Sequence, residues 1–238
     1  MKILIALPAY NEEFILTDSV KKIIDFCFNN LVNDQFVIVI ANNNSTDKTG
    51  QIADNLSLSY SNVEHLFIGQ KGKGLAIASA WSKYDADLYC FMDADLATDL
   101  SALIIAIKQI KSGLDLVIGS RFHKQSQVTR SWQRKFISQC YRWFFKILFL
   151  LKINDFPCGF KVVTRNVRDS LLSEIENQEF FWDTELLVLA NKQGFKILEI
   201  PVIWSAVDNN NRQSKVNIFS TSLNYLKQSI LLKVRLLR

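Results

Sequence analysis

Glycine and proline are scarce in this chain of 238 residues, which contains 8 Gly and 3 Pro. This scarcity excludes a Gly-rich or Pro-rich linker and any low-complexity segment, so no domain boundary stands out. We find no internal repeat either. Hydrophobic residues make up 49% of the chain, enough for a full core, which excludes an intrinsically disordered protein. At this length, we expect a single α/β domain with elaborations.

Long apolar runs are also missing. No run reaches the ~18 residues of a membrane-spanning helix, and the nearest approach, from Trp143 to Leu151, is interrupted by Lys146. The opening residues 1–8 are too short for the apolar region of a signal peptide. The four cysteines are far apart in the sequence, which is typical of free thiols in a reducing compartment. We therefore expect a cytoplasmic protein, peripherally associated with the membrane and without a transmembrane helix.

Arginine is absent from the first 120 residues. That half carries 9 Lys against 14 Asp and Glu, a net charge of −5, whereas residues 121–238 carry 19 basic against 9 acidic residues, a net charge of +10. The basic half favours an anionic partner such as lipid headgroups, phosphates or nucleic acid. The alternative is that these charges only solvate the surfaces of helices.

Apolar runs and helical segments alternate through the first half, which predicts a mostly parallel sheet with crossover helices. The predicted strands are Lys2–Leu7, Phe36–Ala41, Val63–Ile68, Asp87–Met92 and Leu114–Ile118. The predicted helices are Glu13–Asn30, Asp47–Leu58, Gly74–Tyr84 and Asp99–Ser112. In such sheets, ligands bind at the carboxyl ends of the strands, so a motif at that edge counts for more than one elsewhere.

The second half is predicted to combine basic amphipathic helices with shorter elements. A strand at Phe160–Val163, a helix at Asp183–Gln193 and a strand at Lys196–Val202 are expected between helices at Trp132–Leu151 and Ile218–Leu237. Both outer helices mix aromatic or aliphatic residues with Lys and Arg, which suits a lipid–water interface. An ordinary core helix is the alternative for each.

Two Asp-x-Asp pairs differ in their position relative to a strand. Asp85 and Asp87 precede the fourth strand and are interpreted as solvated turn residues. Asp93 and Asp95 follow it, at the carboxyl end, and alternate residues of an extended chain point the same way. Two carboxylates together with diphosphate oxygens are ligands that Mg²⁺ or Mn²⁺ prefers, so we expect the metal site here.

Three other strand ends carry polar groups that suit a nucleotide. Asn43 belongs to a run of three asparagines whose amides could read a base or ribose, with Ser45 or Thr46 capping the following helix. Lys73 lies in a glycine-bearing loop before a helix, a weak phosphate-binding signal. Arg121 ends the fifth strand and could hold phosphate oxygens in bidentate fashion.

A basic stripe occupies the helix that follows. Arg130, Arg134, Ser138 and Arg142 are four residues apart and therefore share one helical face. Taken with the leucines and basic residues near the C-terminus, the stripe favours contact with a membrane surface.

Taken together, these motifs resemble the family 2 glycosyltransferases with a GT-A fold, and the second half resembles the dolichyl-phosphate glucosyl- and mannosyltransferases. The similarity runs over residues 1–216, with 1–121 as the nucleotide-sugar half, 122–216 as the acceptor half, and 217–238 as a basic amphipathic C-terminal helix. The motifs that carry it are Pro8-Ala9-Tyr10-Asn11-Glu12-Glu13, Ser45-Thr46-Asp47-x-Thr49, Gly72-Lys73-Gly74, Asp93-Ala94-Asp95, Gly119-Ser120-Arg121, Asp155-x-x-Cys158-Gly159-Phe160-Lys161, Trp182-Asp183-x-Glu185, Glu199-Ile200-Pro201-Val202-x-Trp204 and Ser214-Lys215.

The resemblance implies a role for each matching position. The metal and diphosphate would lie at Asp93 and Asp95, and Asp155 would have a further role near the reacting centre. Residues expected at the donor are Pro8, Tyr10, Glu12, Asn43, Lys73, Asp93 and Lys215, the last on a loop over the nucleotide-sugar. Residues expected at the acceptor phosphate are Arg121, Arg134 and Ser138.

The chain departs from the family pattern at three points. Asn42-Asn43 stands where the family usually has Asp-Asp, and Ala97 stands where some mannosyltransferases have a Gln metal ligand. Many relatives also carry C-terminal transmembrane helices, which this sequence lacks.

The function implied is inverting, metal-dependent transfer of a hexose, glucose or mannose, from UDP-glucose or GDP-mannose to a polyprenyl or dolichyl phosphate, with no nucleic acid as partner. One alternative is a glycosyltransferase acting on a sugar hydroxyl, which would need Asp155 or Asp183 as base. A sugar nucleotidyltransferase is disfavoured because the loop after the first strand lacks glycine. A basic membrane- or nucleic-acid-binding module would leave the strand-end Asp pair unexplained.

Overall fold

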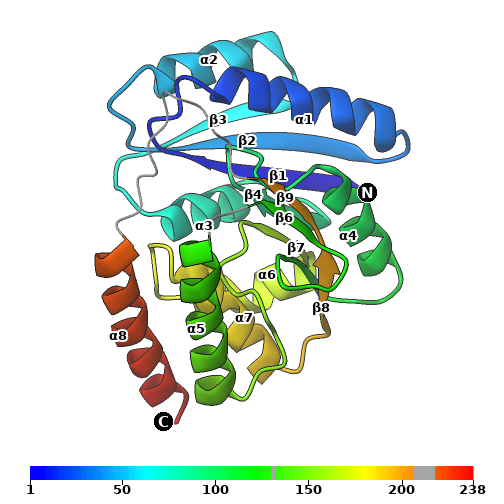
Figure 1. The fold of residues 1–238 in the computed structure, drawn as a ribbon. Helices are drawn as coiled ribbons and strands as arrows, with labels where there is room; N and C mark the ends of the chain where they lie inside the picture. Colours follow the sequence, from blue (N-terminus) through cyan, green and yellow to red (C-terminus); the bar gives the residue numbers. More distant parts are fainter. Residues whose placement is uncertain (130–131, 206–217, 238) are drawn as a thin grey trace.

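A seven-stranded sheet crosses the molecule in the computed structural model (Figure 1). The structure describes residues 1–129, 132–205 and 218–237, without the side chains of residues 132–137 and 218–222. The strand order is β3-β2-β1-β4-β7-β5-β8. The strands are β1 (Lys2–Ala9), β2 (Gln35–Asn43), β3 (Val63–Ile68), β4 (Leu88–Met92), β5 (Leu116–Ser120), β7 (Phe160–Thr164) and β8 (Ile197–Pro201).

The sheet is parallel apart from β7, which confirms the predicted mostly parallel α/β architecture. β1 pairs with β2 and β4 in parallel register, whereas β7 runs antiparallel between β4 and β5. Residues Ile3 to Leu7 of β1 have no exposed surface, as expected for a continuous apolar run covered on both faces. Because β7 comes from the second half of the chain, the sheet contains strands from both halves.

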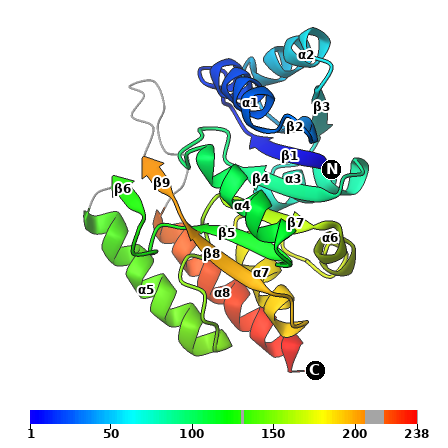
Figure 2. The same cartoon turned by 90° about the vertical axis from the view of Figure 1, so that its right-hand side faces the viewer.

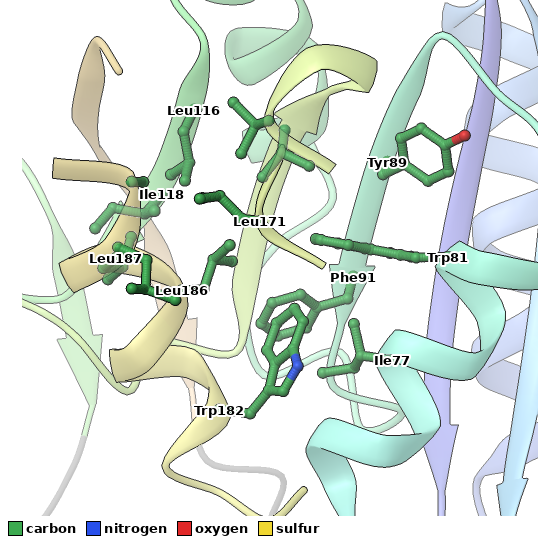
Figure 3. Packing of buried hydrophobic residues seen from close by; sticks show 14 of the residues in the cluster. Ile77, Trp81, Tyr89, Phe91, Leu116, Ile118, Leu171, Trp182, Leu186 and Leu187 are labelled. Carbon is green, nitrogen blue, oxygen red and sulfur yellow. The ribbon is translucent and has the colours of Figure 1, made fainter. Parts of the chain in front are cut away.

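Helices cover both faces of the sheet. They are α1 (Leu16–Asn30), α2 (Thr49–Ser59), α3 (Lys73–Lys83), α4 (Ser101–Lys111), α5 (Trp132–Phe149), α6 (Arg165–Leu171), α7 (Trp182–Lys192) and α8 (Ile218–Leu236). Side chains of α1, α2 and α4 fill one core, and those of α3, α5, α6, α7 and α8 fill the other. Figure 3 shows the second core, where Trp182 meets both Trp81 and Phe91 edge to face.

Every strand and helix predicted from the sequence is present, with ends shifted by a few residues. Three short elements were missed: α6, β6 (Gln127–Thr129) and β9 (Ile203–Ser205). β6 and β9 form a separate parallel pair. Elements of three to seven residues contain too few positions for a hydrophobic period to show.

Helices α5 and α8 lie side by side below the sheet (Figures 1 and 2). Their shared face is aromatic: Tyr225 of α8 packs against Tyr141 and Phe145 of α5. The other face of α8 leaves large apolar side chains exposed, namely Leu223, Leu226, Ile230, Leu231 and Val234. Among the described residues, no helix is both long and apolar enough to cross a membrane.

Candidate active site

Polar loops gather at the carboxyl edge of the sheet because β1, β2, β3, β4 and β5 all end there. The loop after β1 is joined to the loop after β2. Asn11 donates from its backbone N–H to the hydroxyl of Ser45 at 3.0 Å, and its side-chain oxygen accepts from the N–H of Thr46 at 2.8 Å. Neither Ser45 nor Thr46 caps α2, which has no side-chain cap at Lys48, so that expectation is wrong. They hold the first loop instead.

The residues expected around the nucleotide sit in this framework. Glu12 is buried, and its N–H donates to the Thr49 hydroxyl at 2.7 Å. The Lys71 ammonium lies over the ring of Tyr10, 4.6 Å from the ring centre. Pro8 is half-buried near the end of β1.

Asn43 holds the next loop in place. It is 8% exposed, and its side-chain oxygen accepts a 2.8 Å hydrogen bond from the N–H of Gly72. Gly72 adopts φ 156°, and an added Cβ would lie 2.5 Å from the Gln178 carbonyl. The asparagine therefore fixes the glycine that precedes Lys73 at the start of α3.

Asp93 follows β4 and lies against β7. Its Oδ1 is 2.8 Å from the Lys73 ammonium, and its side chain is 42% exposed. Its backbone N–H donates to the Gly159 carbonyl at 3.1 Å. A Cβ on Gly159 would stand 1.8 Å from Asp93 Oδ2, so only glycine fits there.

Asp95 completes the carboxylate pair. Its Oδ1 accepts a 3.1 Å hydrogen bond from the N–H of Ala97, and Leu96 between them adopts the left-handed φ of 50°. The described residues contain no group of three potential metal-ligating side chains. Two carboxylates at an open edge are a donor set that fits a hard divalent cation whose remaining ligands come from a diphosphate and water. The residues therefore fit the metal that the sequence predicts.

A chain of charges runs inward from Asp93. The Lys73 ammonium also lies 3.4 Å from Asp183, whose other oxygen is 3.2 Å from the ammonium of Lys161. Lys161 has no exposed surface and donates to the carbonyls of Phe156 and Cys158. Burial alone would lower the pKa of Lys73, but the negative charges of Asp183 and Asp93 raise it, so Lys73 stays cationic.

Arg121 and Asp155 form a second buried pair. Arg121 donates from Nε and Nη2 to the two carboxylate oxygens at 2.8 and 2.7 Å, and from its backbone N–H at 2.7 Å. Glu199 accepts from the N–H of Asp155 at 3.0 Å and so holds the loop that carries it. Burial would raise the pKa of Asp155, but the charge and hydrogen bonds of Arg121 bring it below its usual value. Asp155 therefore orients the arginine and is unsuited to accept a proton.

The remaining predicted residues fall outside this cluster or outside the description. Lys215 lies outside the described residues, as does the side chain of Arg134. Ser138 is half-buried on α5. Asp85 is exposed at the opposite edge and pairs with Arg165, in agreement with its interpretation as a surface residue.

Sequence reasoning assigned no role to Lys161, Glu199 or Gly159. One signal was available, because a lysine inside the apolar run Phe160–Thr164 is unusual for a strand buried on both faces. Glu199 and Gly159 belong to motifs that carry the family resemblance, but the residues they contact are more than 40 positions away, so no local pattern predicts those contacts.

Solved structures share this fold. Glucosyl-3-phosphoglycerate synthase from Mycobacterium tuberculosis, in complex with Mn²⁺, UDP and phosphoglyceric acid, superposes with a TM-score of 0.72 at 17% identity, covering 98% of this chain and 78% of that one. The predicted GT-A fold is thereby confirmed.

Curated relatives are similar over most of this chain. Glycosyltransferase AglD of Haloferax volcanii is 30% identical over 206 residues, which is 86% of this chain and 33% of AglD. Dolichyl-phosphate beta-glucosyltransferase ALG5A of Trichomonas vaginalis is 31% identical over 215 residues, 86% of this chain and 66% of that protein. This chain thus spans from one third to about two thirds of their lengths.

The family model described as glycosyl transferase family 2 matches residues 4–171. That span runs from β1 to α6 and contains the carboxylate pair, Lys73 and the Arg121–Asp155 pair. With the shared fold and these relatives, the match shows that the chain belongs to glycosyl transferase family 2.

Proposed function

We propose that this protein transfers a hexose from a nucleotide-sugar to a polyprenyl phosphate, with a divalent metal and inversion at the anomeric carbon. The observation that carries the proposal is the buried Arg121–Asp155 pair at the carboxyl edge of the sheet. It presents a fixed guanidinium near enough to Asp93 for that charge to act on it, while the carboxylate that orients it is held in its charged form.

The acceptor class follows from the contacts of the two carboxylates considered as bases, Asp155 and Asp183. Asp155 is fully buried and bound by Arg121, and Asp183 is bound by Lys73 and Lys161. Neither carboxylate is open to take a proton from a sugar hydroxyl. A phosphate monoester has a second pKa near ~6 and is already ionised at neutral pH, so it needs no base. This favours a phosphate acceptor over the hydroxyl alternative.

The protein's own residues would position the reactants. Asp93 and Asp95 would hold Mg²⁺ or Mn²⁺, which neutralises the charge of the leaving diphosphate when bound. Tyr10, Glu12, Asn43 and the loop before α3 would hold the nucleotide. Arg121, with Arg134 and Ser138 of α5, would orient the acceptor phosphate in line with the anomeric carbon, and Lys215 would cover the donor. A single displacement by the phosphate oxygen inverts that carbon.

The relatives favour glucose and a lipid acceptor. Several are dolichyl-phosphate beta-glucosyltransferases, and the Mycolicibacterium smegmatis relative is a polyprenol monophosphomannose synthase. UDP-glucose is therefore the proposed donor, with GDP-mannose as the competing one. The exposed apolar side chains of α8, with Lys227 and Lys233 on the same helix, would rest on the surface of the membrane that carries the acceptor.

The test is transfer of labelled sugar from UDP-glucose and from GDP-mannose to a polyprenyl phosphate in detergent, with Mn²⁺ or Mg²⁺. We expect a lipid-extractable, acid-labile glucosyl product that disappears with EDTA and with Asp95→Asn, while the variant keeps the wild-type melting temperature. Metal-dependent release of nucleotide without a lipid product would support a hydroxyl acceptor instead.

A further inference from the structure

The Lys73 ammonium lies on the carboxylate where the metal is expected. We propose that Lys73 is a resident cation that denies Asp93 to a free metal ion and releases it when a nucleotide diphosphate arrives, so that metal and nucleotide bind together. The inference rests on the proposed function only in taking Asp93 as a metal ligand.

The two oxygens of Asp93 have different surroundings. Oδ1 is 2.8 Å from the Lys73 ammonium, and Oδ2 lies against the backbone at Gly159, where an added Cβ would be 1.8 Å away. A divalent ion that approaches Oδ1 of Asp93 meets the positive charge of the Lys73 ammonium. Like charges at such a separation repel each other, so Lys73 opposes the metal directly.

A second carboxylate lets Lys73 leave Asp93 without losing its counter-charge. Asp183 is 3% exposed and 3.4 Å from the same ammonium. It is itself held by Lys161, which is bonded to two backbone carbonyls. Asp183 is therefore a fixed anion behind Lys73, whereas Asp93 is 42% exposed in front of it.

A diphosphate supplies what the exchange requires. Its oxygens offer Lys73 a new anionic partner and offer the metal further hard ligands. Lys73 is the first residue of α3, and the N–H groups of a helix N-terminus attract the same anion. The nucleotide would thus draw the ammonium off Asp93 and bring the metal ligands in one event.

Binding of Mn²⁺, followed by the electron paramagnetic resonance signal of the free ion, tests this without turnover. In the absence of nucleotide, we expect Lys73→Gln and Lys73→Met to bind Mn²⁺ about tenfold more tightly than wild type, and Lys73→Arg to bind it as weakly as wild type. Addition of UDP should tighten Mn²⁺ binding in wild type and have a much smaller effect in Lys73→Gln. Circular dichroism melting checks that each variant is folded. The Met variant, which keeps an unbranched apolar side chain, is used if the Gln variant does not fold.

Lys83→Gln is the matched control, because Lys83 carries the same charge at the other end of α3, where it is exposed and lies over Tyr84 rather than against Asp93. It should leave Mn²⁺ binding unchanged. Equal Mn²⁺ affinity in wild type and the Lys73 variants would overturn the inference while leaving the metal site in place. No Mn²⁺ binding by wild type with UDP would remove the metal site from the proposed function, and the inference with it.

Discussion

At the scale of single residues, the site depends on a glycine at which a side chain would collide with Asp93. Gly159 lies just before β7, which pairs with β4. Because glycine has no Cβ, there is room for the Asp93 side chain. Gly159→Ala should push the Asp93 carboxylate aside, cost about 1–3 kcal/mol of stability through overpacking, and abolish metal-dependent binding of UDP. Calorimetric titration of UDP with and without Mn²⁺ measures the loss. Gly69→Ala, where the nearest atom would be 4.0 Å away, should melt like wild type; a Gly159 variant that binds normally would refute the steric reading.

The Arg121–Asp155 pair gives a pH dependence with a definite sign. Asp155 has a lower pKa in the folded protein than the ~3.9 of a free Asp. Its stabilisation is therefore complete above that unfolded value and is lost as the pH falls through the folded value. Asp155→Asn should cost about 3–5 kcal/mol at pH 7, because it leaves Arg121 buried without its counter-charge.

Urea unfolding at pH 7, 5 and 3.5 measures this difference between wild type and Asp155→Asn. The difference in unfolding free energy between wild type and Asp155→Asn should be equal at pH 7 and pH 5 and smaller at pH 3.5. Asp85→Asn, which removes an exposed partner of Arg165, should have little effect at any of them. A gap that does not change with pH would mean that the ion pair is not its source.

At the scale of elements, α8 divides its two faces between core and surface. Tyr225, Ser229 and Leu232 are buried, and the Tyr225 hydroxyl donates to the Phe180 carbonyl at 2.8 Å, just before α7 begins. Arg235 pairs with the buried Glu185 of α7. α8 is thus attached to the helix that carries Asp183, while its apolar outer face is left for the proposed membrane contact.

Substitutions on that outer face should weaken membrane binding and spare the fold. Leu226 and Ile230 are 39% and 57% exposed. Changing both to Gln should weaken binding to vesicles of anionic lipid about thirtyfold in a sedimentation assay, because the two side chains together lose about 2 kcal/mol of apolar burial. Val32→Gln with Leu58→Gln, at exposed sites just after α1 and in α2, is the matched control. Equal losses in both double variants would show that no specific face binds.

At the scale of the whole molecule, the two halves share one sheet and one aromatic cluster. Trp182 of α7 packs 5.3 Å from Trp81 of α3 and 5.9 Å from Phe91 of β4 (Figure 3). We propose that residues 1–216 fold as a single cooperative domain, since neither half closes its core alone.

Cooperativity can be measured directly. Tryptophan fluorescence and far-ultraviolet circular dichroism should give one coincident urea transition, and Trp182→Ala should lower its free energy by about 3–5 kcal/mol without splitting it. Phe28→Ala, on the exposed side of α1, serves as the comparison and should change stability far less. Two separate transitions in the wild-type chain would assign the halves to independent domains.

The sequence by itself determined the order of strands and helices and the edge at which the site lies. Apolar periodicity is local, and parallel strands joined by crossover helices must bring their carboxyl ends together. For that reason Asp93, Asp95, Lys73 and Arg121 could be grouped in advance, along with the fold class.

Only the tertiary structure decided which charges pair. Lys73 meets Asp183 across 110 positions and Arg121 meets Asp155 across 34, and both contacts depend on β7 entering antiparallel between β4 and β5. A buried charge needs a partner of opposite charge, and the chain contains many candidates. The local sequence around a charged residue does not indicate which of them becomes its neighbour in the folded protein. Asp155, which the sequence offered as a candidate base, therefore binds Arg121 in the folded protein instead.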